Sequence, residues 1–147
     1  MFVGKLAFAL FGEKMTMIHE EVSQKQNDLL TGRIIGAAIE VHRRLGPGLL
    51  ESTYETCFCY ELNLIGLKVA RQIPVPIFYR GIKLDSGYRI DMIVEDEVVL
   101  EIKSVANLLP VHEAQLLSYL KHNGGGRGLL INFNVKLLKN GIKKLII

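Results

Sequence analysis

Charged residues interrupt two apolar stretches near the middle of this 147-residue chain. Asp91 lies within Tyr88–Val94, and Glu101 and Lys103 lie within Val98–Lys103. Both stretches have the composition of β-strands, and side chains two residues apart in a strand point to the same face, so Glu101 and Lys103 project together. If the acidic turn between the strands is three residues long, the hairpin register puts Asp91 directly opposite Glu101.

Two carboxylates held side by side create an electrostatic problem that a cation solves. Asp91 and Glu101 would repel each other, and the loss of surrounding water would add to the unfavourable energy. Two carboxylates together with water molecules offer the hard oxygen ligands that Mg²⁺ prefers, with Mn²⁺ as the alternative ion. Lys103 could then orient or help to deprotonate an attacking water, or hold a phosphate oxygen. The alternative is an exposed sheet face with a weak Glu–Lys ion pair.

Glu51 is a further acidic candidate. It follows the Gly46-Pro47-Gly48 turn and stands in the first turn of a predicted helix, where the helix dipole favours a carboxylate. It is therefore either a helix-start residue without chemistry or a third acid near the metal site. Tyr54, about one helical turn later, has the position of a core residue or a hydrogen-bonding support.

The helix expected after Lys103 carries the remaining candidates. Gln115 and Tyr119 are four residues apart and share a helix face. The amide of Gln115 could bind a water or a phosphate oxygen, and a solvated glutamine is the alternative. His112 begins the same helix and is more simply a helix-start or packed residue than a ligand.

The sequence excludes several other kinds of site. Cys57 and Cys59 have neither metal-ligand nor redox spacing, and the four histidines form no zinc pattern with them. Two such thiols fit a reduced, cytoplasmic setting. The glycines at 124–126 are not followed by the Lys-Ser/Thr of a phosphate-binding loop, and no Ser-His-Asp arrangement is present.

The spacing of apolar residues predicts the elements that position these side chains. Three- and four-residue steps predict one helix from Asp28 to Leu45, with Asp28 as its N-cap, and a second from about Leu49 to Gly66. The buried stripe expected on the second helix is Leu50, Tyr54, Phe58, Leu62 and Ile65. A strand at 69–77 contains Pro74 and Pro76, which confine it to a sheet edge or make it irregular. The other predicted elements are the two strands described above, a helix at about 111–122 and strands at 129–133 and 142–147.

The composition is that of one globular domain. Hydrophobic residues make up 49% and charged residues 22% of the chain, and no apolar run approaches the roughly 18–20 residues that cross a bilayer. The net charge of +3 is compatible with a nucleic-acid partner but does not argue for one alone. The apolar segment Met1–Thr16 is expected to be an N-terminal extension, either poorly ordered or docked, and residues 17–147 a single domain.

Taken together, these motifs resemble the PD-(D/E)xK nuclease superfamily and, more closely, the GxxExxY protein family. The motif that names this family matches Gly48-Leu49-Leu50-Glu51-Ser52-Thr53-Tyr54, and the similarity covers about residues 28–147. The other similar stretches are Glu40-Val41-His42, Gly87-Tyr88-Arg89-Ile90-Asp91, Pro110–Leu116 and Leu129–Phe133.

The resemblance implies a restriction-endonuclease-like core of the α/β (α+β) class, in which helices flank a mixed β-sheet. The metal ligands that it implies are Asp91, Glu101, the carbonyl of Ile102 and Glu51. Lys103 would position the attacking water, and Gln115 would support the site from its helix.

Two functions are compatible with this pattern. The first is a magnesium-dependent nuclease, a hydrolase of phosphodiester bonds in DNA or RNA. The alternative is a nucleic-acid- or protein-binding module that keeps the nuclease fold with little turnover. A chain of this size offers little surface to grip a duplex, so a homodimer is one expected arrangement, and no membrane partner is expected.

Overall fold

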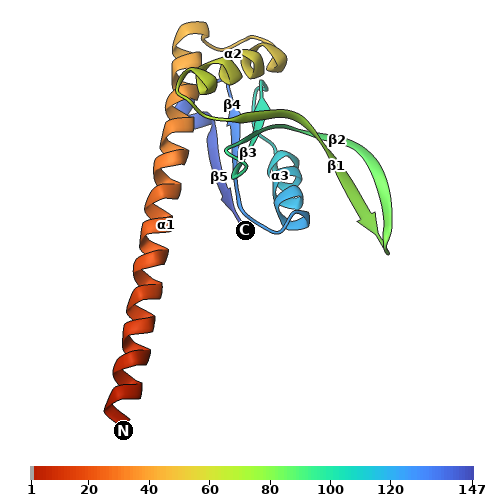
Figure 1. Ribbon diagram of the computed structural model, residues 1–147. Coiled ribbons are helices and arrows are strands. Elements are labelled where there is room, and N and C mark those ends of the chain that lie inside the picture. Colours follow the sequence, from red (N-terminus) through yellow and green to blue (C-terminus); the bar gives the residue numbers. More distant parts are fainter. Residues whose placement is uncertain (1) are drawn as a thin grey trace. The chain divides into compact units, whose positions relative to one another are not determined.

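The computed structural model of the protein describes residues 2–147, apart from the side chains of residues 2, 3, 6 and 86. Its elements follow one another in the order that Figure 1 shows. They are α1 (Phe2–Leu45), α2 (Glu51–Leu64), β1 (Val69–Tyr79), β2 (Ile82–Val94), β3 (Val98–Lys103), α3 (Pro110–His122), β4 (Arg127–Asn132), the 3₁₀ helix η1 (Leu138–Gly141) and β5 (Ile142–Ile146). The chain divides into two compact units, Met1–Ile35 and Gly36–Ile147.

The first unit is helical in all of its described residues. Helix α1 begins at Phe2, so the prediction that a helix starts at Asp28 with that residue as its N-cap is wrong. The physical reason is that residues 17–27 contain neither proline nor glycine, so nothing stops the helix upstream of Asp28. None of the helices in the described part of the chain combines the length and the apolar character that a bilayer crossing needs.

A mixed five-stranded sheet organises the second unit. Its strand order is β1-β2-β3-β4-β5, and every neighbouring pair is antiparallel except β3–β4, which is parallel. Helix α3 provides the crossover that a parallel pair requires. Strand β1 lies at the sheet edge, as its two prolines predict, and its register with β2 shifts between Pro74 and Pro76. The predicted fold class, a mixed sheet flanked by helices, is confirmed.

Strand β3 is covered on both of its faces. Every residue from Val98 to Ile102 is buried, although successive side chains point in opposite directions. Helix α3 contributes Leu116 and Leu120 to the cluster that covers one face. Gly128 on β4 permits this packing, because a Cβ there would lie 3.0 Å from the side chain of Leu116.

Aromatic packing anchors α2 to the rest of this unit. The ring of Tyr54 stacks on Phe133 with 4.5 Å between centroids, and Phe58 meets Phe133 edge-on at 6.0 Å. The predicted buried stripe of α2 is confirmed at Tyr54, Phe58 and Leu62. It is wrong at its two ends, because Leu50 and Ile65 lie just outside the helix and are exposed.

The hydroxyl of Tyr54 holds the turn that joins α1 to α2. Gly46 has a φ of +69°, which a glycine adopts without strain, and its N–H donates to the carbonyl of His42 at 2.8 Å. The Tyr54 hydroxyl accepts a hydrogen bond from the N–H of Leu49 at 3.1 Å and donates to the carbonyl of Gly46 at 2.5 Å. This turn sets the start of α2, and with it the position of Glu51.

We expect Tyr54→Phe to lower the free energy of unfolding by about 1–2 kcal/mol, because two backbone groups lose their hydrogen-bond partner while the stacked ring remains. Urea denaturation followed by circular dichroism measures the change. Tyr60→Phe is the matched control, because Tyr60 is on the same helix and is 64% exposed. Equal stability of the two variants would contradict this account of the turn.

Candidate active site

The hydrogen-bond ladder between β2 and β3 opens at Asp91. The paired residues end at Met92 and Leu100, and the same register places Asp91 opposite Glu101, as the sequence predicts. The Asp91 side chain accepts the next available hydrogen bond through its Oδ2, from the N–H of Ile102 at 2.7 Å. A carboxyl group therefore stands where the backbone ladder would otherwise continue.

Glu101 is a buried acid with an unsatisfied oxygen. Its residue is only 4% exposed, and Oε1 has no hydrogen-bond partner among the described residues. Burial and, after it, the neighbouring Asp91 carboxylate raise the pKa of Glu101 to about 8. The Lys103 ammonium, the Tyr88 hydroxyl and the N–H of Asp91 act in the opposite direction without reversing the shift.

Asp91 is also less acidic than an ordinary aspartate. Burial raises its pKa, the hydrogen bond from Ile102 opposes that change, and the carboxylate of Glu55 raises the pKa again. Lys103 favours the charged form of Asp91, so one lysine influences both carboxyl groups. Added positive charge would stabilise the charged forms of both acids. The unpartnered Oε1 of Glu101 is a carboxylate oxygen, which is a ligand that a hard divalent cation prefers.

The side chains alone do not form a complete metal cage. Within residues 2–147, no group of three His, Cys, Asp or Glu side chains is arranged to hold an ion. A cation at Asp91 and Glu101 would therefore need backbone carbonyl oxygen and water as further ligands, which is the usual preference of Mg²⁺. The residues present fit such an ion.

A pocket of about 530 Å³ opens beside Asp91. Asp91 and Ile102 line it from the sheet, and Glu51 lines it from the first turn of α2. Glu51 is exposed, and its Oε1 accepts a hydrogen bond from the N–H of Ser104 at 3.3 Å. The structure thus brings Glu51, Asp91 and Ile102 to one pocket, whereas Glu101 and Lys103 are not among its lining residues.

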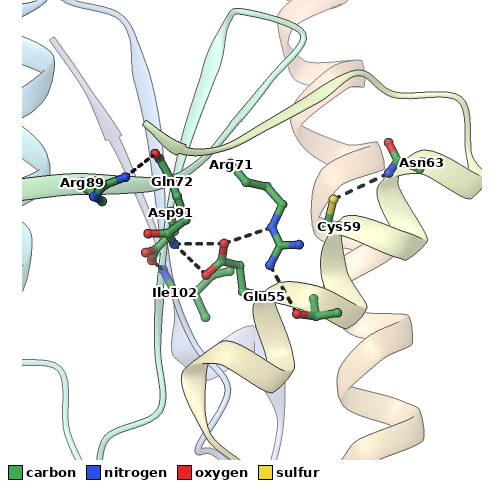
Figure 2. A network of polar contacts seen from close by, with 9 residues as sticks. Glu55, Cys59, Asn63, Arg71, Gln72, Arg89, Asp91 and Ile102 are labelled. Carbon is green, nitrogen blue, oxygen red and sulfur yellow. Dashed lines mark hydrogen bonds and ion pairs between the residues drawn. The ribbon is translucent and has the colours of Figure 1, made fainter. Parts of the chain in front are cut away.

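Glu55 is an acidic residue of this pocket that the sequence interpretation did not include. It is 7% exposed, and its carboxylate accepts hydrogen bonds from Arg71 at 3.1 Å and from the amide of Gln72 at 3.0 and 2.9 Å. Figure 2 shows this network beside Asp91. A sequence signal existed, because Glu55 follows Glu51 by four residues and so shares its helix face.

Gln72 combines this contact with an unusual backbone. Its φ is +51°, in the left-handed region that residues other than glycine seldom occupy. The β1–β2 register, from Arg71 opposite Met92 to Ile73 opposite Ile90, places Gln72 opposite Asp91. A backbone conformation that costs about 1–2 kcal/mol therefore lies directly opposite Asp91.

Gln115 and Tyr119 lie in a different pocket, of about 410 Å³, which Tyr88 also lines. The structure does not bring them to the pocket of Asp91. Their link to the acidic pair is Tyr88, whose hydroxyl lowers the pKa of the Glu101 carboxyl. His112 stands at the start of α3, where its Nδ1 accepts a hydrogen bond from the N–H of Leu109 at 3.0 Å.

The raised pKa of Glu101 leads to an expected pH dependence of the metal-free protein. The folded pKa is about 8 and the ordinary value is 4.5, so the folded state retains a proton that the unfolded state releases between these values. The contribution of Glu101 to the free energy of unfolding should therefore be fully present below about pH 4.5, and the free energy should fall by up to about 5 kcal/mol as the pH rises from there through 8.

Urea denaturation at a series of pH values, with a chelator present, measures this fall. Glu101→Gln should remove most of the slope, because the amide does not titrate. The control is Glu97→Gln, because Glu97 is exposed in the turn before β3, and it should keep the slope of the wild type. A slope that survives in Glu101→Gln would assign the effect to other groups.

A comparison with protein-family models matches most of the chain. The model of the PD-(D/E)XK nuclease superfamily covers residues 28–145, which include all of the candidate site residues. No curated protein and no solved structure gives a significant match. The mixed sheet flanked by helices is consistent with the fold of this superfamily. The protein therefore belongs to the PD-(D/E)XK nuclease superfamily.

Proposed function

We propose that the protein is a metal-dependent nuclease of the GxxExxY type, which hydrolyses phosphodiester bonds in DNA or RNA. Membership of the superfamily supports nuclease-type chemistry on a nucleic acid, and nucleases of this superfamily generally use divalent metal ions. The observation that carries the proposal is the buried Glu101 carboxyl, with its unpartnered oxygen, opposite Asp91. Such a pair is stable in its charged form only when positive charge is added.

The ion that we propose is Mg²⁺ or Mn²⁺. Asp91, Glu101 and the carbonyl of Ile102 would hold it, and Glu51 would complete the acidic surroundings from α2. When bound, such an ion supplies positive charge that stabilises the phosphate oxygens during hydrolysis. Glu51 is already directed to this pocket by the N–H of Ser104.

Lys103 has the proposed role of a proton-handling or orienting residue. It lies at the end of β3, is half-buried and influences both carboxyl groups. As an ammonium group, Lys103 would hold the attacking water or a phosphate oxygen, and as a neutral amine it would accept a proton.

The remaining candidates have proposed supporting roles. Tyr54 fixes the turn before Glu51, and His112 fixes the start of α3. Gln115 and Tyr119 lie one pocket away from Asp91, so their proposed contribution is to hold substrate rather than the ion.

The second candidate function is a binding module without significant turnover. The observation that favours it is the absence, within the described residues, of three preformed metal-ligating side chains. We also propose that residues 17–147 form the nuclease domain and that Met1–Thr16 lies outside it. The proposed location of the protein is the cytoplasm, and its proposed oligomeric state is a homodimer.

We expect Asp91→Asn to weaken the binding of Mn²⁺ by at least about tenfold, because one of two charged ligands is lost. Isothermal titration calorimetry measures this directly. Asp96→Asn is the matched control, because Asp96 is exposed and forms an ion pair with Lys68 instead. Equal binding by the wild type and Asp91→Asn would remove the metal site from the proposal.

Lys103→Ala should lower metal-dependent cleavage by about 10²-fold, the usual loss when a positioned acid–base group is removed. Nucleic-acid affinity should fall much less, because the other lysines and arginines still meet the phosphates. The assay compares cleavage of single-stranded, duplex and branched DNA and of RNA with Mg²⁺ or Mn²⁺.

Lys144→Ala provides the matched control, because Lys144 is an exposed lysine of β5. Its cleavage should equal that of the wild type. A wild-type protein that binds nucleic acid but cuts none of these substrates would favour the binding module.

A further inference from the structure

The pocket between α3 and the β1–β2 ribbon has the chemistry of a small-molecule site. Its volume is about 410 Å³, within the usual range for such sites. Its apolar lining includes Val75 and Pro76 from β1 and Ala114 from α3. The polar lining of the pocket comes from α3, where Gln115, Ser118 and His122 follow one another at three- and four-residue steps and so share a helix face.

A flat molecule with apolar faces and a polar edge matches this lining. The amide of Gln115 offers both donors and an acceptor, the hydroxyl of Ser118 offers both functions, and the rings of Tyr88 and Tyr119 offer stacking surfaces. A nucleobase has this combination of features, and stacking of one base on an aromatic side chain is worth about 1–3 kcal/mol.

An adjoining pocket of about 680 Å³ supplies positive charge for the phosphates on either side of such a base. It shares Val75, Pro76 and Tyr88 with the first pocket and is also lined by Lys83 and Arg89. Asp85 is an acidic residue that also lines it, and its carboxylate accepts a hydrogen bond from the N–H of Gly87 at 3.0 Å.

Arg89 connects this positive surface to the candidate active site. Its Nη1 donates to the carbonyl of Gln72 at 3.5 Å (Figure 2), and Gln72 lies opposite Asp91 in the β1–β2 register. Tyr88 makes a second connection, because it lines both pockets and its hydroxyl lowers the pKa of the Glu101 carboxyl. A strand whose base lies in the α3 pocket would thus have its phosphates close to Arg89 and to the acidic pair.

We propose that the α3 pocket binds one unpaired base of a nucleic-acid strand, and that the substrate is consequently single-stranded or frayed. This inference rests on the proposed nuclease function for its choice of ligand. In an intact duplex the bases are paired and stacked, so filling the pocket would first require unstacking, which costs a few kcal/mol.

Equilibrium binding without metal tests the pocket independently of cleavage. Fluorescence anisotropy in a chelator would compare a labelled single strand of about 12 nucleotides, an abasic strand of the same length and a blunt duplex. We expect the base-bearing strand to bind about tenfold more tightly than the abasic strand, and more tightly than the duplex. Equal affinity for the base-bearing and abasic strands would overturn the proposal.

A pair of variants at one exposed position localises the effect. Ala114→Phe places a ring in the pocket and should reduce the preference for the base-bearing strand to nearly one, whereas Ala114→Ser should preserve it. Thermal melting of both variants checks that they fold. If Ala114→Phe unfolds, Ser118→Leu, at another exposed position of α3 that lines the pocket, takes its place. A filled pocket that leaves the preference unchanged would also overturn the proposal.

Cleavage by the wild type with Mg²⁺ or Mn²⁺ separates this inference from the proposed function. Base-dependent binding without any cleavage would retain the pocket and refute the nuclease. Cleavage together with base-independent binding would retain the nuclease and refute the pocket.

Discussion

The unfavourable closeness of two carboxyl groups, Asp91 and Glu101, at opposite positions of β2 and β3 is the constraint around which the second unit is arranged. Glu101 cannot move into water while both faces of β3 are covered, and the half-buried Asp91 is held beside it by the hydrogen bond from the N–H of Ile102. The energy that holds them together comes from apolar packing, with Leu116 and Leu120 on one side and the stacked rings of Tyr54 and Phe133 elsewhere in the unit. Stability supplied by the core thus maintains a site that would be unfavourable by itself.

Much of this arrangement could be predicted because it depends on local sequence. Apolar periodicity identified the helices and strands of the second unit, and the three-residue turn fixed the pairing of Val94 with Val98. With that pair known, the twofold repeat of a strand places Asp91 opposite Glu101. The prolines of β1 likewise identified an edge strand, because proline lacks the N–H that a second neighbour would need.

The features that the sequence did not predict depend on tertiary contacts. Gln72 adopts a left-handed backbone because of what surrounds it, and a glutamine carries no local signal for that conformation. The spacing of Glu55 from Glu51 indicates a shared helix face, but its burial follows from contacts with Arg71 and Gln72 on another element. The separation of Gln115 from the pocket of Asp91 similarly follows from the placement of α3, which its own periodicity does not determine.

The two outer strands of the sheet have a consequence for assembly. On β1, Pro74 and Pro76 remove backbone donors from the edge, and the register shift between them makes that edge irregular. On β5, Lys143 forms an ion pair with Glu113, and the exposed Lys144 places positive charge where an identical strand would approach. Both margins therefore resist the addition of another strand. Two copies of this chain would have to meet through helices or through the tip of the β1–β2 ribbon, and a continuous sheet shared between them is disfavoured.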